Sequence, residues 1–119
     1  MKIVNKEEFY KLSEGVVYSE YEPCIITELF IKGSTLSSKN TPIDYTCLSL
    51  IGNLDSNNSE EFYNILESSQ ENKTTFKLDF ENYSRDGLYG DDQLYCIYEK
   101  QDLEELIKVL QDSLSRYAR

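Results

Sequence analysis

Apolar and polar residues alternate most clearly in the stretch TTFKLDFE at residues 74–81. A period of two residues is typical of a half-buried strand, so we expect a strand here. Four other stretches are strand-like through their β-branched and aromatic content. They are VVYSEY (16–21), CIITELFIK (24–32), YTCLSLI (45–51) and QLYCIYE (93–99).

Helical spacing predicts three helices, over about residues 6–13, 59–69 and 103–116. In the last of them, the apolar residues recur every three or four positions, and the charged residues lie elsewhere. The apolar positions are Leu103, Leu106, Ile107, Leu110, Leu114 and Tyr117. We expect this face to pack on a sheet.

One phrase occurs twice, as NKEEFY at 5–10 and as NSEEFY at 58–63. In each copy the Asn side chain can accept from an amide of the first helical turn, and the Glu three residues later can reach back to the Asn amide. This capping chemistry explains the repeat without a duplication, which is the alternative. The expected pairs are Asn5 with Glu8, Asn58 with Glu61 and, in a third instance, Asp102 with Glu105.

The expected order is a short strand, a helix, three strands, a helix, two strands and a helix. This order predicts an α+β fold, with a mainly antiparallel sheet of about five to six strands and three helices packed over it. The length of 119 residues suits a single domain over 1–119. Residues 32–42 are expected to form a mobile loop, and residues 81–92 a turn-rich connection.

The composition also indicates where the protein is located and in which state its cysteines are. The start MKIVNKEEF lacks the features of a signal peptide, and no apolar run is long enough to span a bilayer, so we expect a soluble, cytoplasmic protein without membrane contact. Cys24, Cys47 and Cys96 are odd in number and widely spaced. We expect buried thiols rather than disulfides or a metal site.

The formal net charge is −10, and the excess is localised. Residues 55–105 carry fourteen acids and four bases, whereas residues 1–54 carry seven acids and five bases. Such a field repels nucleic acids and anionic membranes, and it favours a basic partner. Direct nucleic-acid binding is therefore not expected.

The chain contains no histidine, which excludes Ser-His-Asp hydrolysis, Cys-His proteolysis and His-ligated zinc. No glycine pattern fits a phosphate loop. The stretch DSNNSEEF at 55–62 begins like a calcium loop, but Glu60 stands where Gly is needed and Leu66 where a bidentate Glu is needed, so it is better explained as the loop and cap of the second helix. We expect no catalytic residue and no cofactor or metal.

The ten tyrosines are the main positive feature. About half are expected in the core, and the others lie among carboxylates, where tyrosine and acid together suit an Arg- and Lys-rich surface. Alternating acids on the 74–81 strand would also imitate a row of phosphates. The residues predicted to bind the partner are Asp79, Glu81, Asp86, Tyr89, Asp91 and Asp92.

The stretches YSEYEPC, IKGSTL and RDGLYGDDQLYCIYEK resemble those of short uncharacterised proteins encoded by bacteriophages and prophages. Small acidic phage proteins include inhibitors of host defence, among them anti-CRISPR proteins, which act by occupying a basic surface. The resemblance carries no residue tied to an activity.

The sequence therefore predicts a non-catalytic acidic binding protein, in its specific form a phage-encoded inhibitor of a nucleic-acid-binding or defence complex. One alternative is an immunity protein that neutralises a basic toxin nuclease. Another is a protein that binds a small ligand or a divalent metal. A homodimer through an exposed strand edge also stays open.

Overall fold

The structure, a computed structural model, describes residues 1–87 and 90–117. Its elements follow the order β1 (Lys2–Asn5), α1 (Lys6–Tyr10), β2 (Val17–Glu22), β3 (Ile25–Ser38), β4 (Thr41–Ser49), α2 (Ser59–Asn72), β5 (Ser84–Arg85), β6 (Leu94–Ile97) and α3 (Lys100–Tyr117). The strands form one sheet in the order β1-β6-β2-β3-β4-β5, and all of its pairings are antiparallel. The expected α+β class and the expected number of strands and helices are confirmed.

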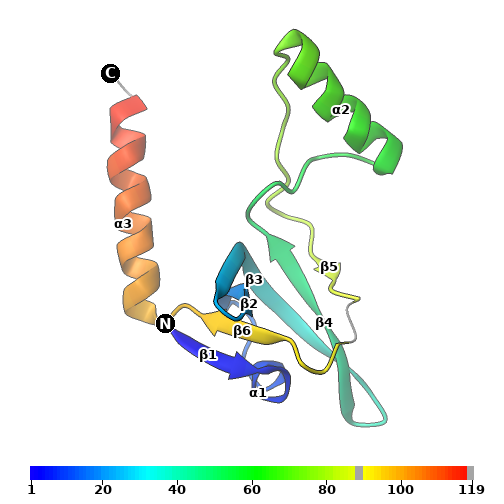
Figure 1. Ribbon diagram of the computed structural model, residues 1–119, viewed down its shortest axis with the longest axis vertical. Coiled ribbons are helices and arrows are strands. Elements are labelled where there is room, and N and C mark those ends of the chain that lie inside the picture. Colours follow the sequence, from blue (N-terminus) through cyan, green and yellow to red (C-terminus); the bar gives the residue numbers. More distant parts are fainter. Residues whose placement is uncertain (88–89, 118–119) are drawn as a thin grey trace.

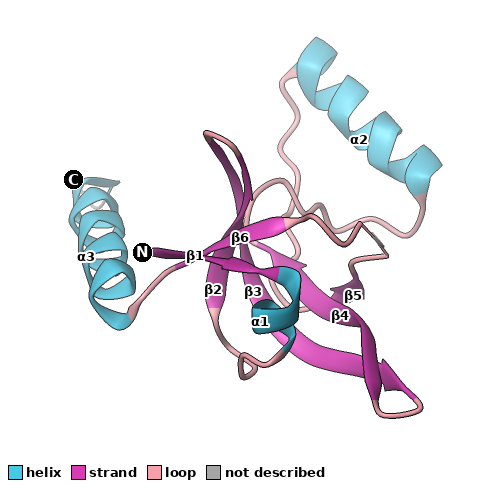
Figure 2. Cartoon of the chain, turned by 60° about the horizontal axis from the view of Figure 1, so that its bottom comes forward, coloured by secondary structure: helices cyan, strands magenta, loops and turns pink. Residues whose placement is uncertain are grey.

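The core lies between α1 and one face of the sheet (Figure 2). Phe9 of α1 is fully buried; its ring stacks on Tyr95 with centroids 4.0 Å apart and meets Tyr18 and Tyr45 edge-on. Aromatic pairs at such separations add about 0.5–1.5 kcal/mol each beyond the burial of their area. The buried cluster comprises Val4, Phe9, Tyr18, Phe30, Tyr45, Cys47, Tyr95 and Ile97.

The two longer helices stand beside the sheet (Figure 1). Neither α2 nor α3 buries a residue, so only α1 covers the sheet as expected. The Cα radius of gyration is 16.7 Å, whereas a compact chain of this length has about 13.5 Å. The molecule is therefore extended, because α2 and α3 project from the sheet on different sides.

Two expectations about strands are wrong. Residues 74–81 form no strand and contribute only one isolated bridge, Leu54 to Leu78. Phe76 and Phe80 are half exposed, so the alternation there has no core to face. The expected mobile loop at 32–42 is instead the far end of the β3–β4 hairpin, which turns at Lys39 and Asn40, both with positive φ.

The capping pairs hold at α1 and in part at α2. The Glu8 N–H donates to Asn5 Oδ1 (2.9 Å), and the Asn5 N–H donates to Glu8 Oε1 (3.2 Å), which is the complete box. The Glu61 N–H donates to Asn58 Oδ1 (2.8 Å), but the Glu61 carboxylate accepts from Asn57 Nδ2 (3.0 Å) instead of returning to Asn58. The interpretation of 55–62 as the loop and cap of α2 is thus confirmed.

The third expected pair is wrong. Helix α3 begins at Lys100, so Asp102 lies within its first turn, where its carboxylate accepts from the Glu99 N–H (2.9 Å). Asp102 therefore plays the role that was expected of Glu105.

Candidate functional site

An ion pair between the buried carboxylate of Asp44 and the partly exposed Arg85 positions residues 84–87, which include Asp86 of the predicted site. Asp44 of β4 is 2% exposed, and its carboxylate accepts from Arg85 Nε (2.9 Å) and from the backbone N–H groups of Tyr45 (2.8 Å) and Gly87 (3.3 Å). Burial alone would raise the pKa of Asp44, but these donors together lower it. The Asp86 N–H also donates to the Tyr45 carbonyl (3.0 Å). Residues 84–87 are thereby fixed along β4.

Behind this segment lies a cavity of about 200 Å³ between α1, the sheet and the connection that follows β5. We call it the acidic cavity. Three carboxylates and one ammonium group are among its lining groups, and two core tyrosines form part of its wall. It is lined by Lys6, Glu20, Tyr45, Asp86, Gly90, Asp92, Gln93 and Tyr95.

The cavity has a strongly negative field. Burial raises the pKa of Glu20, and the negative charges of Glu28, Asp86 and Glu22 raise it further. Lys6 is itself buried, and its Nζ donates to the Gly90 carbonyl (3.1 Å). This contact joins α1 to the connection that follows β5. The positive charge of Lys6 partly offsets the negative charges of the three carboxylates.

Two tyrosines of the buried core, Tyr45 and Tyr95, form part of the wall of the cavity. The Tyr45 hydroxyl donates to the Tyr95 hydroxyl (3.2 Å), and both side chains are buried. Burial raises the pKa of both phenols, so neither ionises near neutral pH. The lining carboxylates can attract a positively charged group, and neither of these two tyrosines is an activated nucleophile.

The structure divides the predicted site residues. Asp86 and Asp92 line the acidic cavity, and Asp91, which precedes Asp92 in the sequence, is exposed. Asp79 and Glu81 line a different cavity, of about 190 Å³. Tyr89 lies outside the described residues.

Asp79 serves the local loop. Its carboxylate accepts from the backbone N–H groups of Glu81 (2.9 Å) and Asn82 (3.1 Å) and from Asn82 Nδ2 (2.8 Å). These bonds lower the pKa of Asp79. Because 74–81 is no strand, the expected row of alternating acids does not form.

Sequence reasoning missed Lys6 and Glu20. Glu20 follows Tyr18 by two positions in β2, which places both on the same face of the sheet, and the regular β2–β6 pairing sets Glu20 opposite Tyr95. An acid in register with core aromatics was the available signal. Lys6 is the second residue of NKEEFY, which was interpreted only as the start of a helix.

The tyrosines that lie among carboxylates in the sequence divide between core and surface. Tyr18 and Tyr95 belong to the core, Tyr21 and Tyr98 are half-buried, and Tyr83 is exposed. Among the thiols, Cys47 and Cys96 are buried as expected, whereas Cys24 is exposed, so the expectation for that residue was wrong.

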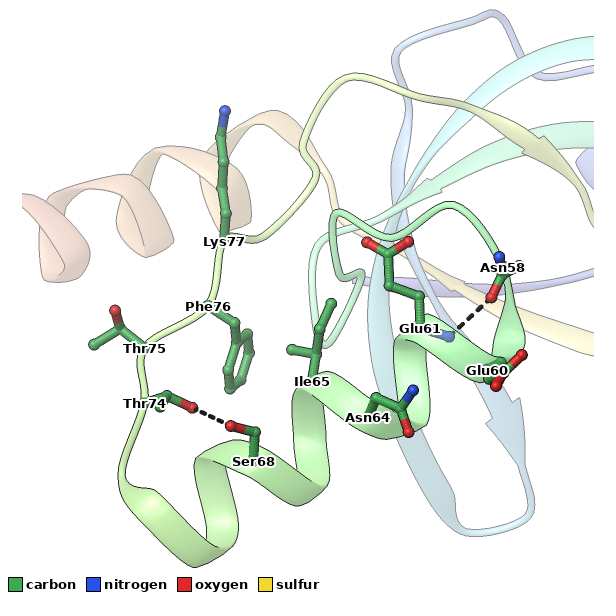
Figure 3. A pocket seen from close by; sticks show the side chains of 10 residues that line it. All are labelled: Asn58, Glu60, Glu61, Asn64, Ile65, Ser68, Thr74, Thr75, Phe76 and Lys77. Atoms are coloured by element: carbon green, nitrogen blue, oxygen red, sulfur yellow. Dashed lines mark hydrogen bonds between the residues drawn. The ribbon is translucent and has the colours of Figure 1, made fainter.

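A larger groove of about 610 Å³ runs between α2 and residues 74–77 (Figure 3). Ile65 and Phe76 face each other across it, and the hydroxyls of Ser68 and Thr74 are 3.1 Å apart at one end. Asn58 and Glu61 mark the other end, where the cap of α2 forms. The groove is thus apolar in the middle and polar at both ends.

Within residues 1–87 and 90–117, no group of three or more Cys, Asp or Glu side chains is arranged to hold a metal ion. Among the described helices, none combines the length and the apolar composition needed to cross a membrane. Comparisons of the chain with protein-family models, with curated proteins and with solved structures gave no match.

Proposed function

We propose that this protein is a non-catalytic binding protein that docks on a basic surface of another protein, with the acidic cavity accepting one Arg or Lys side chain. The observation that carries the proposal is the convergence of Glu20, Asp86 and Asp92 on one cavity that contains a single lysine. Charge complementarity of this kind steers encounter and selects the partner.

The size of the cavity supports a side chain as the occupant. At about 200 Å³ it is smaller than typical small-molecule pockets, which measure about 300–1,000 Å³. The tip of an Arg side chain presents five donors in a planar fork that matches carboxylate oxygens. Burial and neighbouring negative charges raise the pKa of Glu20. A positively charged side chain in the cavity would counteract both effects, because it favours the ionised carboxylate.

The specific form of the proposal is an inhibitor, encoded by a phage, that covers a nucleic-acid-binding or defence complex of the host. It rests on the net charge of −10 and on the resemblance of three stretches to phage proteins. An immunity protein against a basic nuclease has the same electrostatics; a toxin gene next to the gene of this protein would favour it. The 610 Å³ groove at α2 favours a small ligand instead.

The test compares two pairs of isosteric substitutions, each removing two negative charges. The first pair, Glu20→Gln with Asp92→Asn, acts on the acidic cavity. The control pair, Glu67→Gln with Glu71→Gln, acts on exposed positions of α2. Binding of a labelled hexa-arginine peptide is measured by fluorescence anisotropy at low salt, and the same three proteins serve as baits for capture from cell lysate.

We expect the cavity variant to bind the peptide at least ~10-fold more weakly than the control variant, because each lost charge pair in a partly buried site costs about 1.4 kcal/mol or more. The basic proteins captured by the wild type should be retained by the control and lost by the cavity variant. Equal losses in both variants would mean that only net charge matters, and the proposal would then be wrong.

A further inference from the structure

Helix α3 has no cover for its apolar face. It runs for 18 residues from Lys100 to Tyr117, buries none of them, and stands apart from the sheet in both views (Figures 1 and 2). Leu110 is 58% exposed, Leu114 67% and Tyr117 84%. Most helical stability in proteins comes from packing of an apolar face rather than from intrinsic propensity. The exposed face therefore calls for a binding partner.

The spacing of that face indicates another helix. Leu103, Ile107, Leu110, Leu114 and Tyr117 are separated by alternating steps of four and three residues, which is a heptad repeat. We call these five residues the seam. A period of 3.5 residues keeps such a seam turned toward a partner helix over its whole length. Lys100 continues the spacing of the seam at its N-terminal end, and the other charged residues of α3 lie off the seam: Asp102, Glu104, Glu105, Lys108, Asp112 and Arg116.

The charge distribution favours a second copy of the chain as the owner of that helix. Helix α3 carries four acids and three bases, whereas the rest of the chain carries eighteen acids and nine bases. Two copies repel each other over the rest of their surfaces, but along α3 the charge is nearly balanced. A strongly basic partner would instead be drawn to the acidic remainder.

The charges also indicate the direction of pairing. Residues 100–107 carry three acids and one base, whereas residues 108–117 carry one acid and two bases. An antiparallel pair sets the acidic half of each helix against the basic half of the other. It also places the acidic remainders of the two chains at opposite ends of a helix that is about 27 Å long.

We propose that α3 pairs antiparallel with α3 of a second copy, through the seam. Full overlap of the two helices places Leu103 opposite Leu114 of the second copy and Ile107 opposite Leu110 of the second copy, so the contact is self-complementary under two-fold symmetry. The ammonium group of Lys100 then meets the ring of Tyr117 of the second copy, where a cation–π contact adds to the apolar burial.

The experiment is sedimentation velocity of the full chain from about 5 to about 500 µM, because a pairing of two short helices is small and its affinity is expected in the micromolar range. Leu110→Glu tests the seam. Val109→Glu is the matched control: Val109 is the neighbouring residue, is 64% exposed against 58% for Leu110, and lies off the seam. Far-UV circular dichroism checks that both variants keep their secondary structure.

We expect the wild type and Val109→Glu to shift from monomer to dimer with rising concentration, and Leu110→Glu to dimerise at least ~10-fold more weakly. A wild type that stays monomeric up to the highest concentration would overturn the proposal. So would a Leu110→Glu variant that dimerises like the control.

Orientation is tested by cross-linking in a Cys24→Ser background, because Cys24 is the exposed native thiol among the described residues. Leu103→Cys combined with Leu114→Cys should give an oxidised dimer, whereas Leu103→Cys alone should not. Cross-linking of the single Leu103→Cys variant would overturn the antiparallel arrangement.

Discussion

Asp44 links β4 to the segment that carries the acidic cavity, although no sequence motif marks it. Its side chain is almost fully buried and accepts one charge-assisted bond and two backbone bonds. When one partner of such a buried contact is removed, the donor or acceptor left unsatisfied costs more free energy than the intact hydrogen bond contributes. The position is therefore more sensitive to substitution than the exposed acids of the predicted site.

Asp44→Asn should destabilise the protein by about 1–3 kcal/mol at pH 7, because it removes the charge that accepts from Arg85. This loss of stability is smaller than that expected for a fully buried ion pair, because the Arg85 side chain is 55% exposed and water screens its charge. The pKa of Asp44 is lowered in the folded protein. Its contribution is thus present above the unfolded pKa and is lost as the pH falls through the folded pKa.

Urea unfolding of both proteins at pH 7 and near pH 3 measures this effect. The difference between wild type and Asp44→Asn should shrink at the lower pH. A difference that stays constant with pH would show that the ionised carboxylate is not what stabilises this contact.

At the scale of elements, the two EEFY phrases show that one helix start can serve two environments. Phe9 is fully buried beneath α1, whereas Phe62 is only half-buried in α2 and Tyr63 is 68% exposed. The shared part is the Asn cap, which needs only local backbone. The structure thus supports capping chemistry as the explanation, since the two segments do not pack alike.

Phe9→Ala should cost about 3–5 kcal/mol, because it empties a position surrounded by three aromatic rings. Phe62→Ala is the matched control in the second phrase, and it should cost below about 1 kcal/mol. Guanidinium unfolding of the two variants gives the comparison. Similar losses in both would mean that α2 is packed as tightly as α1.

An element could be predicted from the sequence where its local pattern agrees with its surroundings in the fold. Strands β2, β3, β4 and β6 were predictable because β-branched and aromatic runs meet a buried surface there, whereas β5 lies in the stretch 81–92 that was expected to be a turn-rich connection. Residues 74–81 carry an equally good pattern but lie outside the sheet, where Phe80 is 54% exposed. The β3–β4 turn lies within the loop expected at residues 32–42, but its place at Lys39 and Asn40 was not predicted, because it lacks the glycine that usually marks positive φ.

At the scale of the whole molecule, the site was predictable only in its local part. Asp86, Asp91 and Asp92 are close in sequence, so their proximity needed no knowledge of the fold. Lys6 and Glu20 join Asp86 and Asp92 only because β2 and β6 pair and α1 packs on the same face. Such contacts depend on the order of strands in the sheet, and one sequence does not reveal that order.

The two proposed surfaces should respond to salt in opposite directions. Binding of a basic ligand at the acidic cavity is driven by attraction between exposed and partly buried charges. The Debye length falls from about 10 Å at 0.1 M salt to about 3 Å at 1 M, so this attraction weakens. Pairing of α3 joins two copies that each carry a net charge of −10, so the same screening removes repulsion.

Measuring both equilibria in 0.1 and 1 M NaCl on one preparation therefore separates the two surfaces. The affinity for hexa-arginine should fall at least ~10-fold, while the dissociation constant of the dimer should stay constant or decrease, since apolar burial along the seam does not depend on charge. A dimer that weakens in parallel with peptide binding would be held by ion pairs between acidic and basic patches. In that case the exposed leucines of α3 would not be its interface.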